Sequence, residues 1–204
     1  MSTHEGAVAA PAHDEQHTSL GVNNTKLAMW AFLGSECLFF GSFITTYLLY
    51  RNSVTAGPTP HEIYDIPYTS VSSFVLLMSS LTMVLALNSI QKGDHHANRI
   101  WLLATAFLGM VFIGGQVYEF TTFVEEGLTL STSTFGSSFY VLTGFHGAHV
   151  TVGILMLLSL VLMSSFGRLG TEDAHKVEMV GLYWHFVDVV WIVIFTIVYL
   201  IPTN

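Results

Sequence analysis

The chain has 204 residues, of which 51% are hydrophobic and only 10% charged, and its mean hydropathy is +0.57. Because a globular domain in water carries about 25% charged residues, this composition excludes an ordinary soluble domain and indicates a chain surrounded largely by lipid. The formal net charge of −8 argues against a nucleic-acid partner, and the single cysteine, Cys37, excludes a disulfide framework and a cysteine-based metal site within the chain.

Residues 1–25 are polar and lack hydrophobic periodicity, so they are predicted to form a flexible N-terminal tail. Three histidines lie there, His4, His13 and His17, but scattered histidines in a tail are usually solvated and do not indicate a metal site. No linker in residues 26–204 is long enough to separate a second domain, so these residues are predicted to form one membrane domain.

Five long apolar segments follow the tail. A bilayer core of about 30 Å needs roughly 20 helical residues, and every segment reaches that length. Only helices satisfy their own backbone hydrogen bonds in lipid without closing a barrel, and the alternation typical of a barrel strand is absent. The predicted fold class is therefore all-α, an integral membrane bundle of five transmembrane helices. Their predicted ranges are 26–50, 67–91, 99–124, 135–166 and 177–201.

The basic residues predict the orientation in the membrane. When successive loops are assigned to alternate sides of the membrane, five basic residues fall on one side, namely Lys26, Lys92, Arg99, Arg168 and Lys176. Only Arg51 falls on the other face. Because cytoplasmic loops carry an excess of basic residues, the N-terminus is predicted to be cytoplasmic and the C-terminus to lie outside.

Six ionisable side chains lie within the predicted helices and carry most of the functional signal. A charged group at the centre of a membrane helix costs about 2.5–3.5 kcal/mol on insertion scales, so we expect these groups to face the bundle interior and to partner one another. This candidate set, proton-linked or part of a buried polar seam, comprises Glu36, Glu119, His146, His149, His185 and Asp188.

Two pairs in this set, His146 with His149 and His185 with Asp188, have i, i+3 spacing and therefore share a helix face. Neutral imidazole is a common metal ligand, so one interpretation is a metal or haem site. The alternative is hydrogen bonding between packed helices. Gly144 and Gly147 beside His146 favour the alternative, since they would let another backbone come close and leave little room for a porphyrin.

Glu36 lies near the predicted midplane of the first helix and allows two roles. A carboxyl in a dry site is held largely protonated. Such a group can form hydrogen bonds as a neutral acid, or it can relay protons, and the residues alone leave both roles open.

Four sequence motifs indicate more about function than the composition does. They are Gly34–Gly41 (GSECLFFG), Gln116–Phe120 (QVYEF), Thr143–Val150 (TGFHGAHV) and Tyr183–Trp191 (YWHFVDVVW). In this order they resemble subunit III of the haem–copper oxygen reductases, the cytochrome c oxidase family, and the resemblance covers residues 25–202. The nine-residue motif of the last helix is the most specific of the four.

The resemblance implies an accessory subunit of a proton-pumping terminal oxidase in aerobic respiratory electron transport. It implies no catalytic residue, cofactor or metal in this chain, since haem and copper belong to partner subunits. It further implies contact with subunit I, with subunit II and a small subunit IV as other partners, and bound phospholipid. Glu36 matches the family's buried, carbodiimide-reactive glutamate. The remaining five candidate residues match motif positions that hold the fold or a lipid.

The mitochondrial type of this subunit has seven helices, whereas this chain resembles the short five-helix bacterial form, which predicts a multi-pass protein of the bacterial plasma membrane. That form occurs in both cytochrome c oxidases and quinol oxidases, so the electron donor stays open. Two other classes are a small proton-coupled transporter and a membrane cytochrome with two histidine ligands. The chain shows neither the internal repeat nor the broken helices typical of the transporter.

Overall fold

The computed structural model describes residues 24–53 and 64–201, and within these ranges it contains helices and no strands. The helices in chain order are α1 (Asn24–Tyr50), α3 (Ile66–Gln91), α4 (His95–Glu125), α5 (Thr134–Ser165), the 3-10 turn η1 (Thr171–Asp173), α6 (Ala174–Phe195) and the π-helical turn η2 (Thr196–Leu200). In the described part, five helical spans are long and apolar enough to cross a membrane. The predicted all-helical membrane class is thus confirmed, while the predicted tail 1–25 lies almost entirely outside the described residues.

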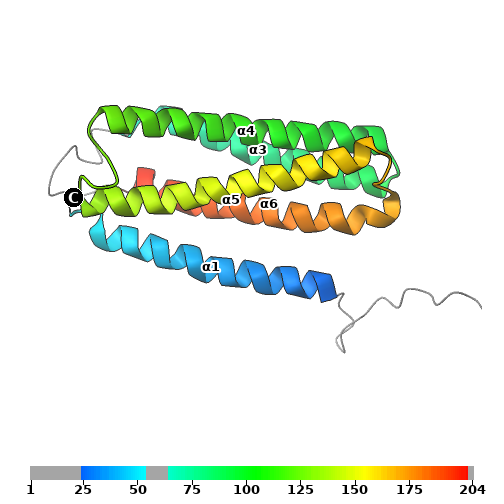
Figure 1. Ribbon diagram of the computed structural model, residues 1–204, viewed down its shortest axis with the longest axis horizontal. Helices are drawn as coiled ribbons and strands as arrows, with labels where there is room; N and C mark the ends of the chain where they lie inside the picture. The colour runs from blue at the N-terminus through cyan, green and yellow to red at the C-terminus, as the bar shows by residue number, and fades with distance from the viewer. Residues whose placement is uncertain (1–23, 54–63, 202–204) are drawn as a thin grey trace, which may run out of the picture.

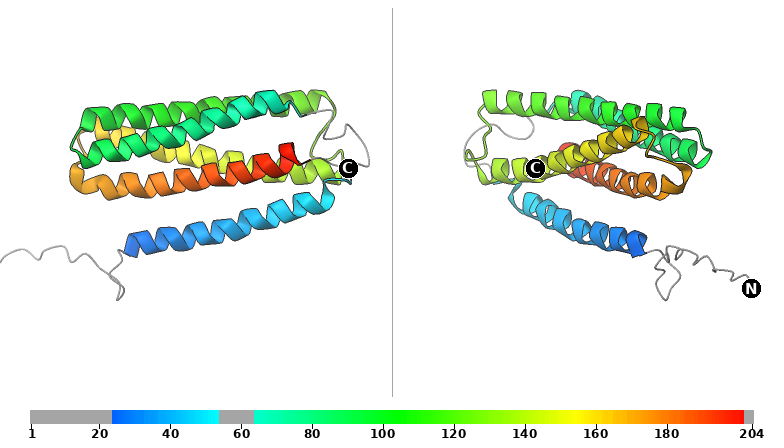
Figure 2. Two further views of the ribbon diagram at one scale, coloured as in Figure 1. Left: turned by 180° about the vertical axis from the view of Figure 1, so that it is seen from behind. Right: turned by 45° about the vertical axis from the view of Figure 1, so that its right-hand side comes forward.

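The helices run side by side as an elongated bundle (Figure 1). Helices α3 and α4 pack against each other, α5 and α6 lie beneath them, and α1 lies on the far side of α5 and α6 (Figure 2). Since successive long helices alternate in direction, the five basic residues predicted to share a face do gather at one end of the bundle, opposite Arg51.

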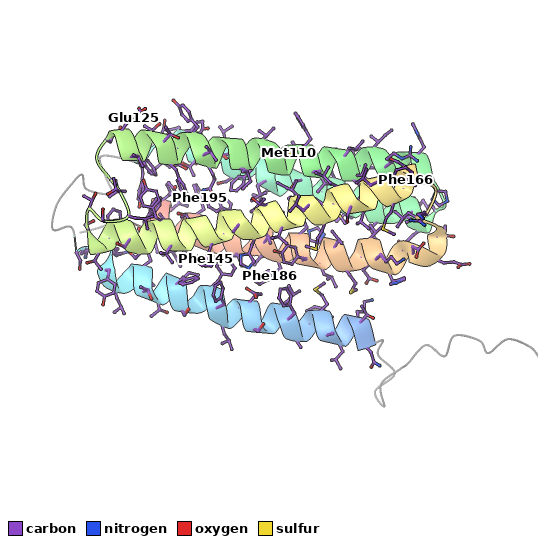
Figure 3. All side chains as sticks on the ribbon, in the orientation of Figure 1. Met110, Glu125, Phe145, Phe166, Phe186 and Phe195 are labelled. Atoms are coloured by element: carbon purple, nitrogen blue, oxygen red, sulfur yellow. The ribbon has the colours of Figure 1, made fainter. Side chains whose placement is uncertain are left out.

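Helix α1 contacts the bundle through one narrow face. Its buried residues, Leu33, Phe40 and Tyr47, recur every seven residues, which is two helical turns. Phe145 of α5 and Phe186 of α6 lie between their helices and α1 (Figure 3), with ring centroids 5.6 Å from Phe39 and 6.4 Å from Phe40, respectively. Most other side chains of α1 are exposed or half-buried.

Capping side chains accept backbone hydrogen bonds at the start of three helices, α3, α4 and α5. Helix α4 starts at His95, before the expected residue 99, because the Asp94 carboxylate accepts a hydrogen bond from the Ala97 amide at 2.9 Å. The chain reverses after α3 and α4 at Gly93 and Gly127, whose φ angles of 78° and 93° suit a residue without a β-carbon.

Two tryptophans of α6 organise the core. Trp184 and Trp191 are 0% and 1% exposed, and their indole nitrogens donate to Ser79 and Ser73 of α3 at 2.8 and 2.9 Å. A β-carbon added to Gly109 of α4 would lie 2.6 Å from the Trp184 ring, and one added to Gly153 of α5 would lie 2.8 Å from it. The Trp184 side chain therefore fits between α4 and α5 because both of these residues are glycines.

Candidate functional site

Five of the six candidate side chains take part in three separate contacts between helices, and the sixth, His146, stands apart. The three contacts share no side chain, so they do not form one centre. Each joins a different pair or trio of helices, so each is described with the helices that it connects.

The first contact joins α1 to α5. The Glu36 carboxylate oxygen Oε2 lies 3.2 Å from His149 Nε2, and both side chains are mostly buried. On its other side the His149 ring places Nδ1 2.7 Å from the Phe145 carbonyl oxygen, one turn earlier in α5. The Phe40 ring packs edge-on against the imidazole with centroids 4.9 Å apart.

The contact with the Phe145 carbonyl oxygen fixes which nitrogen of the His149 ring carries a hydrogen. A carbonyl oxygen only accepts, so His149 Nδ1 carries a hydrogen. The His149 Nε2 atom faces the Glu36 carboxylate at 3.2 Å, although Glu36 Oε2 makes no hydrogen bond to any described residue. The contact therefore pairs two ionisable groups of different helices by proximity inside the bundle.

The second contact joins α3 to α6. Ser80 Oγ lies 3.0 Å from His185 Nδ1 and makes a short hydrogen bond to Asp188 Oδ2. A hydroxyl has a single hydrogen, so when Ser80 donates it to Asp188 the serine oxygen accepts from His185 Nδ1–H. The i, i+3 pair of α6 is thereby connected through one side chain of α3. Asp188 is 3% exposed, and its other oxygen has no hydrogen-bond partner among the described residues.

The third contact lies nearer the Arg51 end and joins α3, α4 and η2. Glu119 Oε1 accepts from Thr69 Oγ1 at 2.8 Å and from the Tyr199 hydroxyl at 3.1 Å. The π-helical turn η2 carries Tyr199 to this position. Glu119 also lines a cavity of about 480 Å³ together with Asp65 and Tyr68.

His146 is 0% exposed and stacks on Trp191, with ring centroids 5.0 Å apart. Neither ring nitrogen has a hydrogen-bond partner in the part of the chain that the structure describes, contrary to the expected bond between helices. The flanking glycines do not bring another backbone of the described chain close, contrary to expectation, because a β-carbon on Gly144 would meet nothing within 4 Å. At Gly147 the nearest atom, at 3.4 Å, belongs to the Gln116 side chain and not to another backbone.

Sequence reasoning missed the partners of these groups, namely Ser80, Thr69 and Tyr199. A signal was present in the second apolar segment, which has no charge but contains several serines and threonines. Hydroxyl groups in a membrane helix face either their own backbone or a neighbouring polar group, so these residues were candidates for contacts between helices. Among the described residues, no three His, Cys, Asp or Glu side chains come together to hold a metal ion.

Comparison with known proteins matches almost the whole chain. The family model described as Cytochrome c oxidase subunit III matches residues 5–202. The chain is 40% identical over 190 residues to the cytochrome c oxidase subunit 3 of Bacillus sp. strain PS3, covering 93% of this chain and 92% of that protein. It is 41% identical over 180 residues to a probable quinol oxidase subunit 3 of Staphylococcus saprophyticus, covering 88% and 90% of the two chains. A match of this extent, together with the five membrane spans, shows that the chain belongs to the cytochrome c oxidase subunit III family.

Proposed function

We propose that this chain is an accessory subunit of a bacterial haem–copper oxygen reductase. In this role it packs against the haem-bearing subunit I, stabilises it and supports proton uptake, and it holds no redox centre of its own. The proposal rests on one observation, which is that the ionisable groups make contacts between helices. Glu36, Asp188 and Glu119 each hydrogen-bond or pair with a side chain of another helix. Such contacts hold helices together and do not present a set of ligands to a metal.

Residues 26–204 are proposed to form one domain in the plasma membrane, with the N-terminus in the cytoplasm. The support is the charge of the bundle ends, since five basic residues lie at one end. Two of them also hold helices together there. Lys26 of α1 forms an ion pair with Glu178 of α6 at 2.6 Å, and Arg99 of α4 donates to the Ser164 carbonyl oxygen of α5 at 2.9 Å.

Bound phospholipid is part of the proposal. A cavity of about 250 Å³ lies between α1 and α5, and its lining includes Phe43, Tyr50 and Val141. Because α1 contacts the bundle through one narrow face, acyl chains can enter beside it. The pair formed by Glu36 and His149 lies on the same helices and supplies the proton-linked site of the proposed function, while the structural role of that pair stays open beside it.

The proposal predicts that the tagged chain, extracted from its own membrane in mild detergent, elutes with a large haem-bearing subunit. Visible spectra and mass spectrometry of the eluate measure this. If the chain elutes alone and moves a solute across liposomes, the proposal is wrong and the transporter is right.

The same eluate identifies the electron donor. We propose cytochrome c as the electron donor. Quinol is the alternative, since relatives of both donor types match this chain. A subunit II with a copper-binding set of cysteine and histidine residues supports cytochrome c, and a subunit II without that set supports quinol.

A further inference from the structure

A groove runs between α4 and α5, and its α5 wall is made of small residues. It has a volume of about 190 Å³. From α4 it is lined by Ile113, Gln116, Val117 and Phe120, and from α5 by Thr143, Gly144, Gly147 and Thr151. The two glycines leave the α5 backbone uncovered, which is the arrangement that lets two membrane helices approach closely.

Gln116 gives this groove a chemical preference. The side chain is only 5% exposed, and its amide nitrogen Nε2 has no hydrogen-bond partner among the described residues. The threonine hydroxyls beside it already donate within α5, from Thr143 to the Phe139 carbonyl oxygen at 2.7 Å and from Thr151 to that of Gly147 at 2.8 Å. Leaving a buried donor unpaired is destabilising, so an occupant that brings an acceptor is favoured.

The depth of Gln116 decides what kind of occupant can bring that acceptor. With α4 (His95–Glu125) centred on the bilayer, Gln116 lies six residues from the centre, about 9 Å along the axis. The hydrocarbon region extends about 15 Å from the midplane, so lipid ester groups and bulk water lie farther out. An acyl chain reaches this depth but has no acceptor. A neighbouring helix has serine or threonine hydroxyls and, near glycine or proline, accessible carbonyl oxygens.

We propose that the groove between α4 and α5 receives a membrane-spanning helix of a partner subunit, which crosses over Gly144 and Gly147 and accepts a hydrogen bond from Gln116. The identity of that partner as an oxidase subunit rests on the proposed function, whereas the location of the contact rests on the groove itself.

Two glycines of this chain give a matched test of the contact. A β-carbon added to Gly144 meets nothing within 4 Å, and the same is true of Gly114 on α4, which is outside the groove lining. At both positions the first carbon of a leucine side chain therefore enters open space, so the two substitutions are matched at the backbone. We expect Gly144→Leu to fill the groove and lower the amount of the co-purifying subunit that crosslinks at Val117 by about fivefold or more, with Gly114→Leu close to the unmodified chain. Equal retention by both variants would overturn the proposal.

The hydrogen bond is tested by Gln116→Leu, which keeps the approximate side-chain size and removes the amide. One hydrogen bond between membrane helices changes an equilibrium by about threefold on average, so partner retention in a detergent titration is expected to fall by about that factor. Unchanged retention would show that the partner does not use the Gln116 amide.

Photocrosslinking in the assembled complex locates the partner directly. A benzoylphenylalanine residue replaces Val117 in the groove or, as the control, Val111, which is exposed on another side of α4. The expected product at Val117 is a crosslink to a transmembrane segment of a co-purifying subunit, with none at Val111. Crosslinks to lipid alone from Val117, in a complex that retains its haem-bearing subunit, would refute the groove contact and leave the proposed function standing. Loss of the haem-bearing subunit from the unmodified chain would instead refute the proposed function.

Discussion

The packing of Trp184 makes the sharpest prediction about stability. A β-carbon at position 109 would lie 2.6 Å from the ring atom Cη2, whereas carbon atoms in contact are normally about 3.5–4.0 Å apart. The overlap is thus about 1 Å, and Gly109→Ala forces the indole or the helices to move. Overpacking of this kind costs about 1–3 kcal/mol.

Gly114→Ala is the matched control, because its added methyl group meets nothing within 4 Å on the same helix. Both variants gain the same helix propensity, up to about 1 kcal/mol, so the difference between them isolates the overlap with Trp184. We expect Gly109→Ala to be less stable than Gly114→Ala by about 1–3 kcal/mol, which is a factor of about 5 to 150 in the unfolding equilibrium.

The assay is reversible unfolding of the purified chain in mixed micelles titrated with sodium dodecyl sulfate and followed by circular dichroism. In a Trp184→Phe background the Gly109→Ala substitution should cost less than it does in the unmodified chain, because the smaller ring leaves room for the methyl group. Equal stability of the two alanine variants would refute the account of the core as an indole held between glycines.

Two further outcomes follow from the polar contacts. Glu36→Gln keeps a hydrogen-bonding group opposite His149, so the assembled complex is expected to form in normal yield with altered turnover or proton pumping at most; complete loss of oxygen reduction in a fully assembled variant would contradict an accessory role. Tyr199→Phe removes one of the two donors that the described residues supply to Glu119 and leaves Thr69, so the free energy of unfolding in micelles should fall by about 0.6–1.7 kcal/mol, and an unchanged value would show that the hydroxyl contributes nothing.

The number of membrane spans followed from the sequence because hydrocarbon thickness and backbone hydrogen bonding leave few alternatives for long apolar segments. The start of α4 did not, because it depends on a cap: Asp94 accepts from a backbone amide and begins the helix among polar residues. An apolar segment therefore indicates where a helix crosses lipid, whereas a capping residue indicates where that helix begins.

The candidate site was less predictable because its side chains lie on different helices. Charge in an apolar segment identified Glu36 and Asp188, but their partners depend on how the helices rotate against each other. The glycines show the same limit. Gly144 was expected to admit another backbone beside His146, but it faces open space. Gly109 and Gly153 instead make room for Trp184, and this contact between three helices is not visible in any local sequence pattern.

The central claim is that this chain serves redox chemistry carried out by its partners. The most direct test separates the purified oxidase complex with a harsher detergent and records a visible spectrum of each fraction. The account predicts that the haem Soret band stays with the large subunit and that the fraction holding this chain alone shows no absorption in that region. A Soret band that travels with this chain would contradict the account.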